Sequence, residues 1–308
     1  MDENDIEITE DIEEESQEKR EKLTIEAGKI ANKIKNEIKI KPGDSINEIC
    51  ERIEKRIKDE GGDFAFPVNI SINEIAAHDT ASINDERIIR ENDVVKIDIG
   101  VHKNGFIADG AFTLDFSGEY GKMMDANKEA LENAVSKIRA GVNTSEIGNE
   151  IEKTAIKYGF KTIENLTGHG LERYSIHSSP SIPNRHSGRG IELKEGDIIA
   201  IEPFFTLGDK SGYVTEMDRT EIFSAYSFES TRNKDARKLM ELIVKERKTL
   251  PFAERHYAKT ASNRIALIEL IRNGSLMAYP VLREKTKGIV TQFEHTVIVR
   301  NDSCEVVF

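Results

Sequence analysis

Two stretches of this 308-residue chain repeat one another, and the repeat constrains the fold more than any other feature. The first copy is Glu91-Asn-Asp-Val-Val-Lys-Ile-Asp98, and the second is Glu195-Gly-Asp-Ile-Ile-Ala-Ile-Glu202. Each copy opens with Glu-x-Asp and then becomes rich in β-branched residues, a pattern that indicates a turn leading into a strand. We therefore predict a duplicated half-domain, in which each half delivers one acidic residue, Asp98 or Glu202, to a shared site.

A hairpin signal follows the first copy. Asn104-Gly105 is typical of a two-residue hairpin turn, because both residues tolerate positive φ. A turn at Lys103-Asn104 would place Asp109 directly opposite Asp98, whereas a turn at Asn104-Gly105 would place it diagonally on the same face. Like charges side by side destabilise a sheet, and a divalent cation would neutralise them. A solvated sheet face with two exposed carboxylates is the alternative.

Three further residues could complete a ligand set. His169 lies in the Gly-flanked segment Thr-Gly-His-Gly-Leu, which we expect to be a loop. Glu202 and Glu294 lie in β-rich apolar segments, where an unpaired carboxylate is costly. Four carboxylates and one imidazole suit hard or borderline divalent metals. Such a set can hold two ions about 3.5–4 Å apart that activate a water for hydrolysis.

In this order the motifs resemble those of the methionine aminopeptidases, which have an α+β pita-bread fold with two pseudo-two-fold related halves. The shared motifs are Asp98-x10-Asp109, Gly168-His-Gly170, Ile201-Glu-Pro-Phe204 and Gln292-Phe-Glu-His-Thr296. The likeness to type II members is closer, through Phe64-Ala-Phe-Pro67, Ala76-Ala-His78 and Tyr174-Ser-Ile-His177. Type II members also carry a helical insertion between the two glutamates, and 91 residues separate Glu202 from Glu294 here.

The resemblance implies an enzyme that removes the N-terminal Met of nascent polypeptides when the second residue is small. It implies two divalent ions (Co, Mn, Fe or Zn) held by Asp98, Asp109, His169, Glu202 and Glu294, with Glu202 also able to move a proton. It further implies that His78 and His177 contact the first peptide group and support the tetrahedral intermediate. Phe66, Ile176 and Tyr279 would line the pocket for the methionine side chain.

Purely structural roles are the alternative at these positions. His78 or His177 taken alone could be a hydrogen-bonded loop residue, and His186 and His256 are interpreted in that way. The aromatic residues could be ordinary core. The chain also departs from the family locally: Asp79-Thr80-Ala81 follows His78 where Tyr-Thr-Pro is usual, and Gly110 stands where Cys or another small residue is commoner.

Two rival functions share this fold. Prolidases and aminopeptidases P use the same type of metal site, but they usually have an additional N-terminal domain and lack the long helical insertion. A non-enzymatic binding homologue, associated with ribosomes or growth, is the second rival. Such homologues have lost metal ligands, whereas all five ligand positions are filled here.

Composition adds limits on location and partners. The net charge is −12, but ten acidic residues and no basic ones lie in residues 1–18, so the rest is nearly neutral. We expect residues 1–20 to form a flexible acidic tail and the body to lack a nucleic-acid surface. No apolar run could span a membrane, the N-terminus is too acidic for a signal peptide, and two cysteines are too few for a disulfide framework. We expect a cytoplasmic, ribosome-proximal monomer acting on peptides and nascent chains.

Hydrophobic periodicity and capping residues predict the domain organisation. We expect a pita-bread domain over residues 21–202 and 288–308, with a strand continuation and a winged-helix-like helical insertion over 203–287. Charges of both signs balance one another in the insertion, so DNA binding is not expected. Helices are predicted near 22–35, 44–58, 121–139, 144–158, 233–250 and 260–273, and strands at 68–72 and in the 93–115 hairpin.

Overall fold

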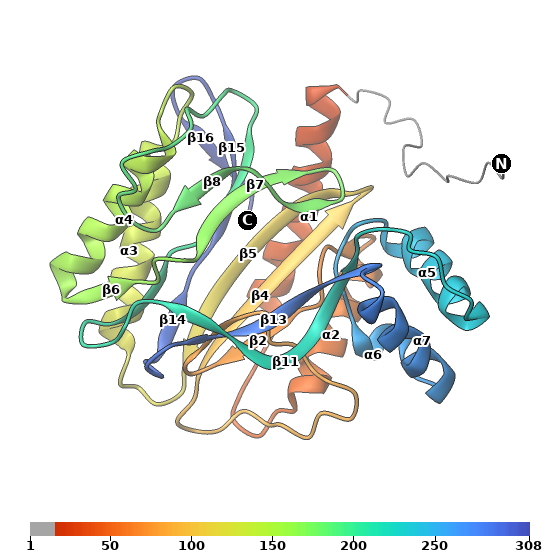
Figure 1. Ribbon diagram of the computed structural model, residues 1–308. Helices are drawn as coiled ribbons and strands as arrows, with labels where there is room; N and C mark the ends of the chain where they lie inside the picture. Colours follow the sequence, from red (N-terminus) through yellow and green to blue (C-terminus); the bar gives the residue numbers. More distant parts are fainter. Residues whose placement is uncertain (1–15) are drawn as a thin grey trace.

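The computed structural model describes residues 16–308, so most of the predicted acidic tail lies outside the described residues. In Figure 1, strands fill the middle of the molecule, helices α3 (Gly121–Lys137) and α4 (Thr144–Tyr158) lie on one side, and α5 (Lys234–Arg247), α6 (Glu254–Tyr257) and α7 (Ala261–Arg272) lie on the other. Helices α1 (Gln17–Glu37) and α2 (Ile46–Asp59) complete the helical set of the described residues. None of these helices is both long and apolar enough to cross a bilayer.

Sixteen strands form four sheets within residues 16–308. The first sheet holds β1 (Asp63–Phe64), β2 (Asn69–Ile72), β4 (Val94–Lys103) and β5 (Phe106–Asp115). The second holds β6 (Phe160–Thr162), β10 (Phe204–Leu207) and β14 (Val290–Gln292), and the third holds β3 (Ile75–Ala77), β11 (Val214–Ala225), β12 (Phe252–Ala253) and β13 (Leu276–Glu284). The fourth holds β7 (Thr167–Glu172), β8 (Ser175–Pro183), β9 (Ile198–Ile201), β15 (His295–Val299) and β16 (Cys304–Val306).

The repeated segments form the same local structure in both halves. In each, the aspartate of Glu-x-Asp accepts a hydrogen bond from the backbone N–H three residues earlier, at 2.8 Å for Asp93 and 2.7 Å for Asp197. The carbonyl of each aspartate then accepts from a residue at the end of the neighbouring strand, Phe116 or Val299. The predicted turns lead into β4 and β9, so the sequence repeat corresponds to a structural repeat.

The hairpin adopts the second of the two registers considered. Asn104 and Gly105 both have positive φ, 52° and 89°, and Lys103 pairs with Phe106 across them. Consequently Asp98 pairs with Ala111, and Asp109 pairs with Gly100. The two aspartates are diagonal neighbours on one face of the sheet, and the directly opposed arrangement is excluded.

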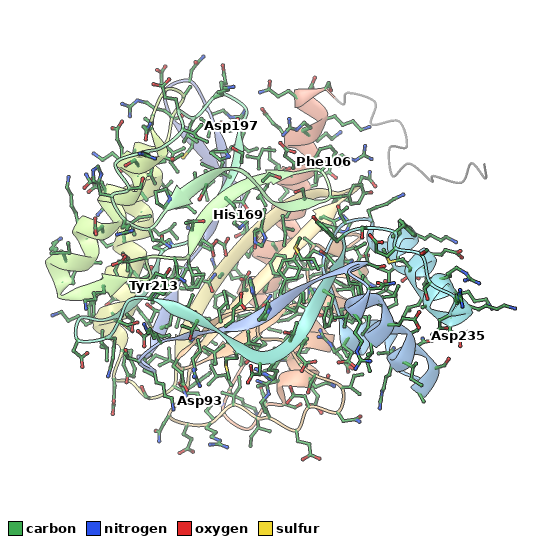
Figure 2. All side chains as sticks on the ribbon, viewed as in Figure 1. Asp93, Phe106, His169, Asp197, Tyr213 and Asp235 are labelled. Atoms are coloured by element: carbon green, nitrogen blue, oxygen red, sulfur yellow. The ribbon has the colours of Figure 1, made fainter. Side chains whose placement is uncertain are left out.

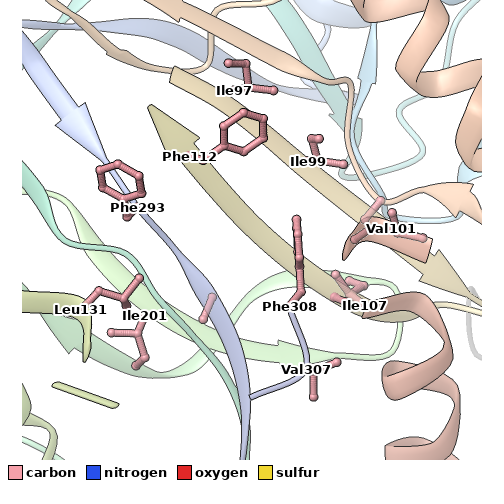
Figure 3. Close-up of a cluster of buried hydrophobic side chains, with 14 of the residues drawn as sticks. Ile97, Ile99, Val101, Ile107, Phe112, Leu131, Ile201, Phe293, Val307 and Phe308 are labelled. Atoms are coloured by element: carbon pink, nitrogen blue, oxygen red, sulfur yellow. The ribbon is translucent and has the colours of Figure 1, made fainter. Parts of the chain in front are cut away.

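The hydrophobic core is divided between the body and the insertion. Alternating residues of β4 and β5 pack beneath α1, and Figure 3 shows Ile97, Ile99 and Phe112 of this cluster together with Phe308. A second cluster lies under α5 and α7 and includes Phe223, Leu239 and Leu267. Whether the insertion folds as a separate unit, with the boundaries given above, stays a prediction.

The expected helices are present, with longer or shorter ends. The first begins at Gln17 rather than near residue 22, because the Ser16 hydroxyl accepts from the N–H of Lys19 and caps the helix there. Ser45 caps α2 in the same way through the N–H of Glu48, as its sequence pattern predicts. Residues 248–250 lie outside α5, which ends at Arg247.

Candidate metal centre and active site

Four carboxylates reach one place from two pairs of strands. Asp98 and Asp109 come from β4 and β5, and Glu202 directly follows β9. The β9–β15 register pairs Ile201 with His295, so the next step of the ladder brings Glu294 opposite Glu202. With His169 of β7, labelled near the middle of the molecule in Figure 2, all five side chains line one pocket.

The side chains of the cluster lie close together, and the His169 imidazole forms no hydrogen bond to the neighbouring carboxylates. Single ligand atoms of Asp109, His169 and Glu294 lie within 4.8 Å of each other. His169 Nε2 lies 3.6 Å from Glu202 Oε1 and 3.9 Å from Asp109 Oδ2, beyond hydrogen-bond length. This spacing leaves room for a cation between the side chains.

His169 presents its ring in one orientation. Its Nδ1 lies 3.3 Å from the carbonyl of Gly170, so Nδ1 is the protonated nitrogen and Nε2 faces the carboxylates with a free lone pair. The segment is a strand rather than the expected loop, because it pairs with both β8 and β9. The flanking glycines permit this pairing: a Cβ on Gly168 would lie 2.3 Å from the Ala200 carbonyl oxygen, and one on Gly170 2.1 Å from that of Ser179.

Threonine side chains join the two halves at the site. Thr296 Oγ1 lies 2.7 Å from both the backbone nitrogen and the carbonyl oxygen of Asp109. Thr113 Oγ1 likewise accepts from the backbone N–H of Gln292 at 2.9 Å and donates to its carbonyl oxygen at 2.7 Å. Between them, the N–H of Glu294 donates to the carbonyl of Ala111. These three links run side by side and fix the position of Asp109 relative to Glu294.

The electrostatics of the site disfavour the charged carboxylates. Burial raises the pKa of Asp98 to about 7. Burial, and then repulsion from neighbouring carboxylates of the group, raise the pKa values of Asp109 and Glu294 well above the ordinary range. Burial and Asp98 do the same for the pKa of Glu202. Burial lowers the pKa of His169 to about 3, so its imidazole is neutral. No lysine or arginine of residues 16–308 forms an ion pair with any of these carboxylates.

The donor set fits divalent metal ions. Asp98 Oδ1 and Asp109 Oδ1 are both buried, and neither has a hydrogen-bond partner in the described residues. Buried polar atoms without partners are rare and costly in folded proteins. A cation bound among the carboxylates would satisfy these atoms and remove the mutual repulsion that raises the pKa values.

A pocket of about 350 Å³ opens above the carboxylates. Its apolar wall includes all three residues expected there, and its polar wall includes both histidines. The lining residues used below are Phe66, His78, Ile176, His177, Ile222 and Tyr279. The ring of His177 packs edge-to-face against the imidazole of His169, with centroids 4.7 Å apart. His177 thus lies beside His169, and it is exposed whereas His169 is buried.

His78 is held in a strained backbone conformation. Its φ is 61°, which is uncommon for a residue with a side chain and is found at functional sites. Its Nδ1 lies 3.2 Å from the carbonyl oxygen of Pro280, so Nδ1 donates and Nε2 is left free. Its ring packs edge-to-face on Tyr279 at 5.8 Å. Burial, followed by the charge of His177, lowers the pKa of His78 to about 4, so the ring is neutral.

Asp79, the departure next to His78, forms a buried ion pair with two arginines. Arg87 Nη1 lies 2.9 Å from its carboxylate, and Arg219 Nη2 lies 2.6 Å from it. Its side chain is 2% exposed. Arg219 belongs to β11, so this ion pair connects the loop that carries His78 to the strand that carries Ile222.

Three further residues at the site were given no role from the sequence. Gln292 Nε2 lies 3.4 Å from both Glu202 Oε2 and Glu294 Oε2, and strand alternation two residues before Glu294 could have indicated it. Asn69 pairs with Asp98 across β2 and β4 and also lines the pocket. No sequence pattern could have indicated Ile222, because its position in the pocket depends on the pairing of β11 with β13.

The fold and the site together define a metallopeptidase. A family model described as metallopeptidase family M24 matches residues 22–301, and the chain belongs to that family. The pita-bread fold expected from the sequence is thereby confirmed, with mixed helices and strands as an α+β protein.

Proteins of similar sequence indicate which kind of metallopeptidase the chain resembles. The chain is 47% identical over 288 residues to the methionine aminopeptidase of Pyrococcus horikoshii, covering 92% of this chain and 97% of that one. It is 48% identical over 289 residues to the methionine aminopeptidase of Archaeoglobus fulgidus, covering 93% and 97%. The resemblance to methionine aminopeptidases recognised in the sequence is confirmed.

Solved structures agree on the fold. A structure titled as a thermophilic Arx1 has a TM-score of 0.79 at 18% identity, covering 94% of this chain and 90% of that one. The methionine aminopeptidase of Thermotoga maritima has a TM-score of 0.68 at 20% identity, covering 95% and 97%. At these identities the likeness concerns the fold alone.

Proposed function

We propose that this protein removes the N-terminal methionine from polypeptides whose second residue is small, by hydrolysis at a dinuclear metal centre. The observation that carries the proposal is the cluster of four carboxylates and one neutral imidazole at the floor of a largely apolar pocket. The identity of nearly half of all aligned residues to archaeal methionine aminopeptidases supports the same activity.

The proposed metal ligands are Asp98, Asp109, His169, Glu202 and Glu294. This oxygen-rich set with one nitrogen accepts Co, Mn, Fe or Zn in the divalent state. When bound, the ions polarise the scissile carbonyl and make a water nucleophilic at neutral pH. Thr113 and Thr296 hold the ligand strands in register, and Gln292 donates to two of the glutamates.

The remaining polar residues would orient the peptide and move a proton. His78 and His177 flank the space above the carboxylates, and the free Nε2 of His78 can accept a hydrogen bond from the first peptide group. Glu202 is partly exposed to the pocket, and burial raises its pKa, so it can take a proton from the nucleophile and return it to the leaving amine.

Substrate selection follows from the shape of the pocket. Phe66, Ile176 and Tyr279, joined by Ile222, offer an apolar slot for an unbranched side chain such as methionine. The scissile carbonyl must lie against the metal centre, so the second side chain is pressed between the histidines and the carboxylates. Only a small second residue (Gly, Ala, Ser, Thr or Val) fits there. A carboxylate of the centre is the natural partner of the free α-amine.

The expected setting of the enzyme follows from this substrate. Its partners would be peptides and nascent chains with N-terminal Met, encountered close to the ribosome in the cytoplasm, and the protein would act as a monomer. A membrane or nucleic-acid partner is not part of the proposal, since the body of the chain is nearly neutral.

The decisive experiment compares hydrolysis of Met-Ala-Ser, acetyl-Met-Ala-Ser and Ala-Pro peptides by protein loaded with each metal in turn. We expect cleavage of Met-Ala-Ser alone. Cleavage of the acetylated peptide, or a preference for proline in the second position with any first residue, would favour the prolidase alternative. His78→Ala should lower kcat by about 10²-fold with metal content unchanged, the usual contribution of a positioned proton donor or acceptor. Loss of metal from that variant would contradict its role as a substrate contact.

A further inference from the structure

The apolar wall of the pocket continues beyond the pocket along the insertion strands. β11 and β13 run antiparallel, side by side, from the centre of the molecule towards α5 and α7 (Figure 1). Ile222 pairs with Tyr279, and both line the pocket. Because side chains alternate between the two faces of a sheet, the same face next carries the pair Ser224 and Met277.

The side chains of this face become exposed as the strands leave the pocket. Ser224 Oγ lies 3.1 Å from the Tyr279 hydroxyl oxygen, which places the two on one face, and Ser224 is buried. Met277 is 42% exposed. Tyr226, whose N–H donates to the carbonyl of Ser275 and continues the pairing, is 68% exposed. We name Met277 and Tyr226, with Ser224 between them and the pocket, the apolar strip.

The opposite face of the same strands is already covered. Phe223, Ala225 and Leu276 alternate with the strip residues and pack in the core under α5 and α7. The exposed side chains of the strip are therefore not an open edge of that core. They form a separate apolar surface that begins at the wall of the pocket.

We propose that the apolar strip binds the third to fifth residues of the substrate and favours apolar side chains at those positions. This inference rests on the proposed function, because it requires a peptide whose N-terminus lies at the carboxylates. Continuity with the pocket identifies the occupant: a peptide leaving past Tyr279 next meets Met277. Two residues of an extended chain advance about 6.4–6.8 Å, the same as the step from Tyr279 to Met277 along β13. The strip itself carries no charged side chain.

The test measures kcat/KM for three peptides with the metal-loaded, full-length protein. They are Met-Ala-Ser, Met-Ala-Ser-Phe-Leu-Ser and Met-Ala-Ser-Gly-Gly-Ser. We expect the Phe-Leu hexapeptide to exceed the Gly-Gly hexapeptide by about tenfold, since partial burial of one large apolar side chain has that effect. In Met277→Ala/Tyr226→Ala the ratio between the hexapeptides should fall to near one.

Matched controls separate this role from general damage. Ile265→Ala/Ile268→Ala removes two apolar side chains of α7 that are 63% and 48% exposed, outside the strip, and should keep the tenfold ratio. Met277→Gln keeps the size of the side chain but adds a polar amide, and should reduce the ratio even if the double variant folds poorly.

The possible results distinguish substrate binding by the apolar strip from dimer formation and from failure of the proposed function. Two results would contradict the proposal that the apolar strip binds substrate: equal cleavage of both hexapeptides by the wild type, or a ratio preserved in both strip variants. A concentration-dependent dimer of the wild type that disappears in the strip variants would assign this surface to a second copy of the chain instead. Failure to cleave even Met-Ala-Ser would reject the proposed function and not the strip in particular.

Discussion

Two clusters in this molecule bury carboxylates, and they differ in whether a positively charged side chain compensates them. At the proposed metal centre, Asp98, Asp109, Glu202 and Glu294 lie together; burial raises all four pKa values, and repulsion from neighbouring carboxylates further raises those of Asp109, Glu202 and Glu294. Between α2 and the insertion, Glu54 is 7% exposed, but Arg255 Nη2 and His256 Nε2 contact its carboxylate oxygens. Burial alone would raise the pKa of Glu54; the hydrogen bond from His256 and the charge of Arg255 lower it below its ordinary value.

The two clusters differ in the kind of partner that compensates their charge. An unpaired buried charge costs several kcal/mol, so a carboxylate that serves only the fold is given a cationic partner. Glu54 has Arg255 as its cationic partner, accepts a hydrogen bond from His256 Nε2, and also accepts from the N–H of Val68 at 3.2 Å. The carboxylates of the proposed metal centre have none within the described residues, and a bound metal ion is the partner that we propose for them.

The largest effect is expected from Asp109→Asn. The change removes one ligand charge and should abolish both turnover and tight metal binding while leaving the fold intact. In the presence of a chelator the variant should be at least as stable as the wild type, because one source of repulsion is gone. Activity assays, metal analysis and thermal unfolding in chelator test this. A variant that regains near-normal turnover after metal titration would contradict the dinuclear proposal.

The opposite result is expected at the other cluster. Glu54→Gln leaves Arg255 and His256 without their carboxylate and should lower the free energy of unfolding by about 3–5 kcal/mol, the usual penalty for breaking a buried ion pair. Metal content should not change. Glu51→Gln, at an exposed position of the same helix, is the matched control and should change stability little. Denaturant unfolding of both variants measures the difference, and equal stabilities would show that the Glu54 ion pair does not stabilise the fold.

The pH dependence of stability should differ in sign between the clusters. Asp98 has a pKa of about 7 in the metal-free fold, above its ordinary value of 3.8, so its contribution to stability is lost as pH rises from about 4 towards 7. The pKa of Glu54 is lowered, so its contribution is present above its ordinary value of 4.5 and is lost on acidification. Unfolding of metal-free protein across this range should show the decline towards neutral pH. Saturating divalent metal should remove that decline, whereas a decline that persists with metal would place its origin elsewhere.

The smallest effect should come from Asp79→Asn. The change weakens the contacts with Arg87 and Arg219 and should lower the free energy of unfolding by about 2 kcal/mol, as for hydrogen bonds to charged groups. Because Asp79 adjoins His78, we also expect KM and kcat for Met-Ala-Ser to change while metal content stays the same. Asp85→Asn, which affects Arg87 but not Arg219, is the control. Identical kinetics in both variants would show that the Asp79 ion pair serves the fold only.

Local structure and the types of residue at the proposed metal centre could be predicted from the amino-acid sequence. Turn residues and β-branched runs fixed β4, β9 and the Asn104-Gly105 hairpin, since these depend on neighbours in the chain. Alternation along the strands then put Asp98 and Asp109 on one face. The motif order carried the family resemblance, and the types of residue in it predicted a metal site.

Contacts between segments far apart in the chain could be seen only in the folded structure. Thr113 and Thr296 join the halves, Arg219 reaches Asp79 from β11, and the pairing of β11 with β13 brings Ile222 beside Tyr279. His169 became part of a strand because β8 and β9 lie on both sides of it, although its glycines favour a loop. No local propensity encodes such pairings, because they follow from how the cores of the two halves and the insertion pack together.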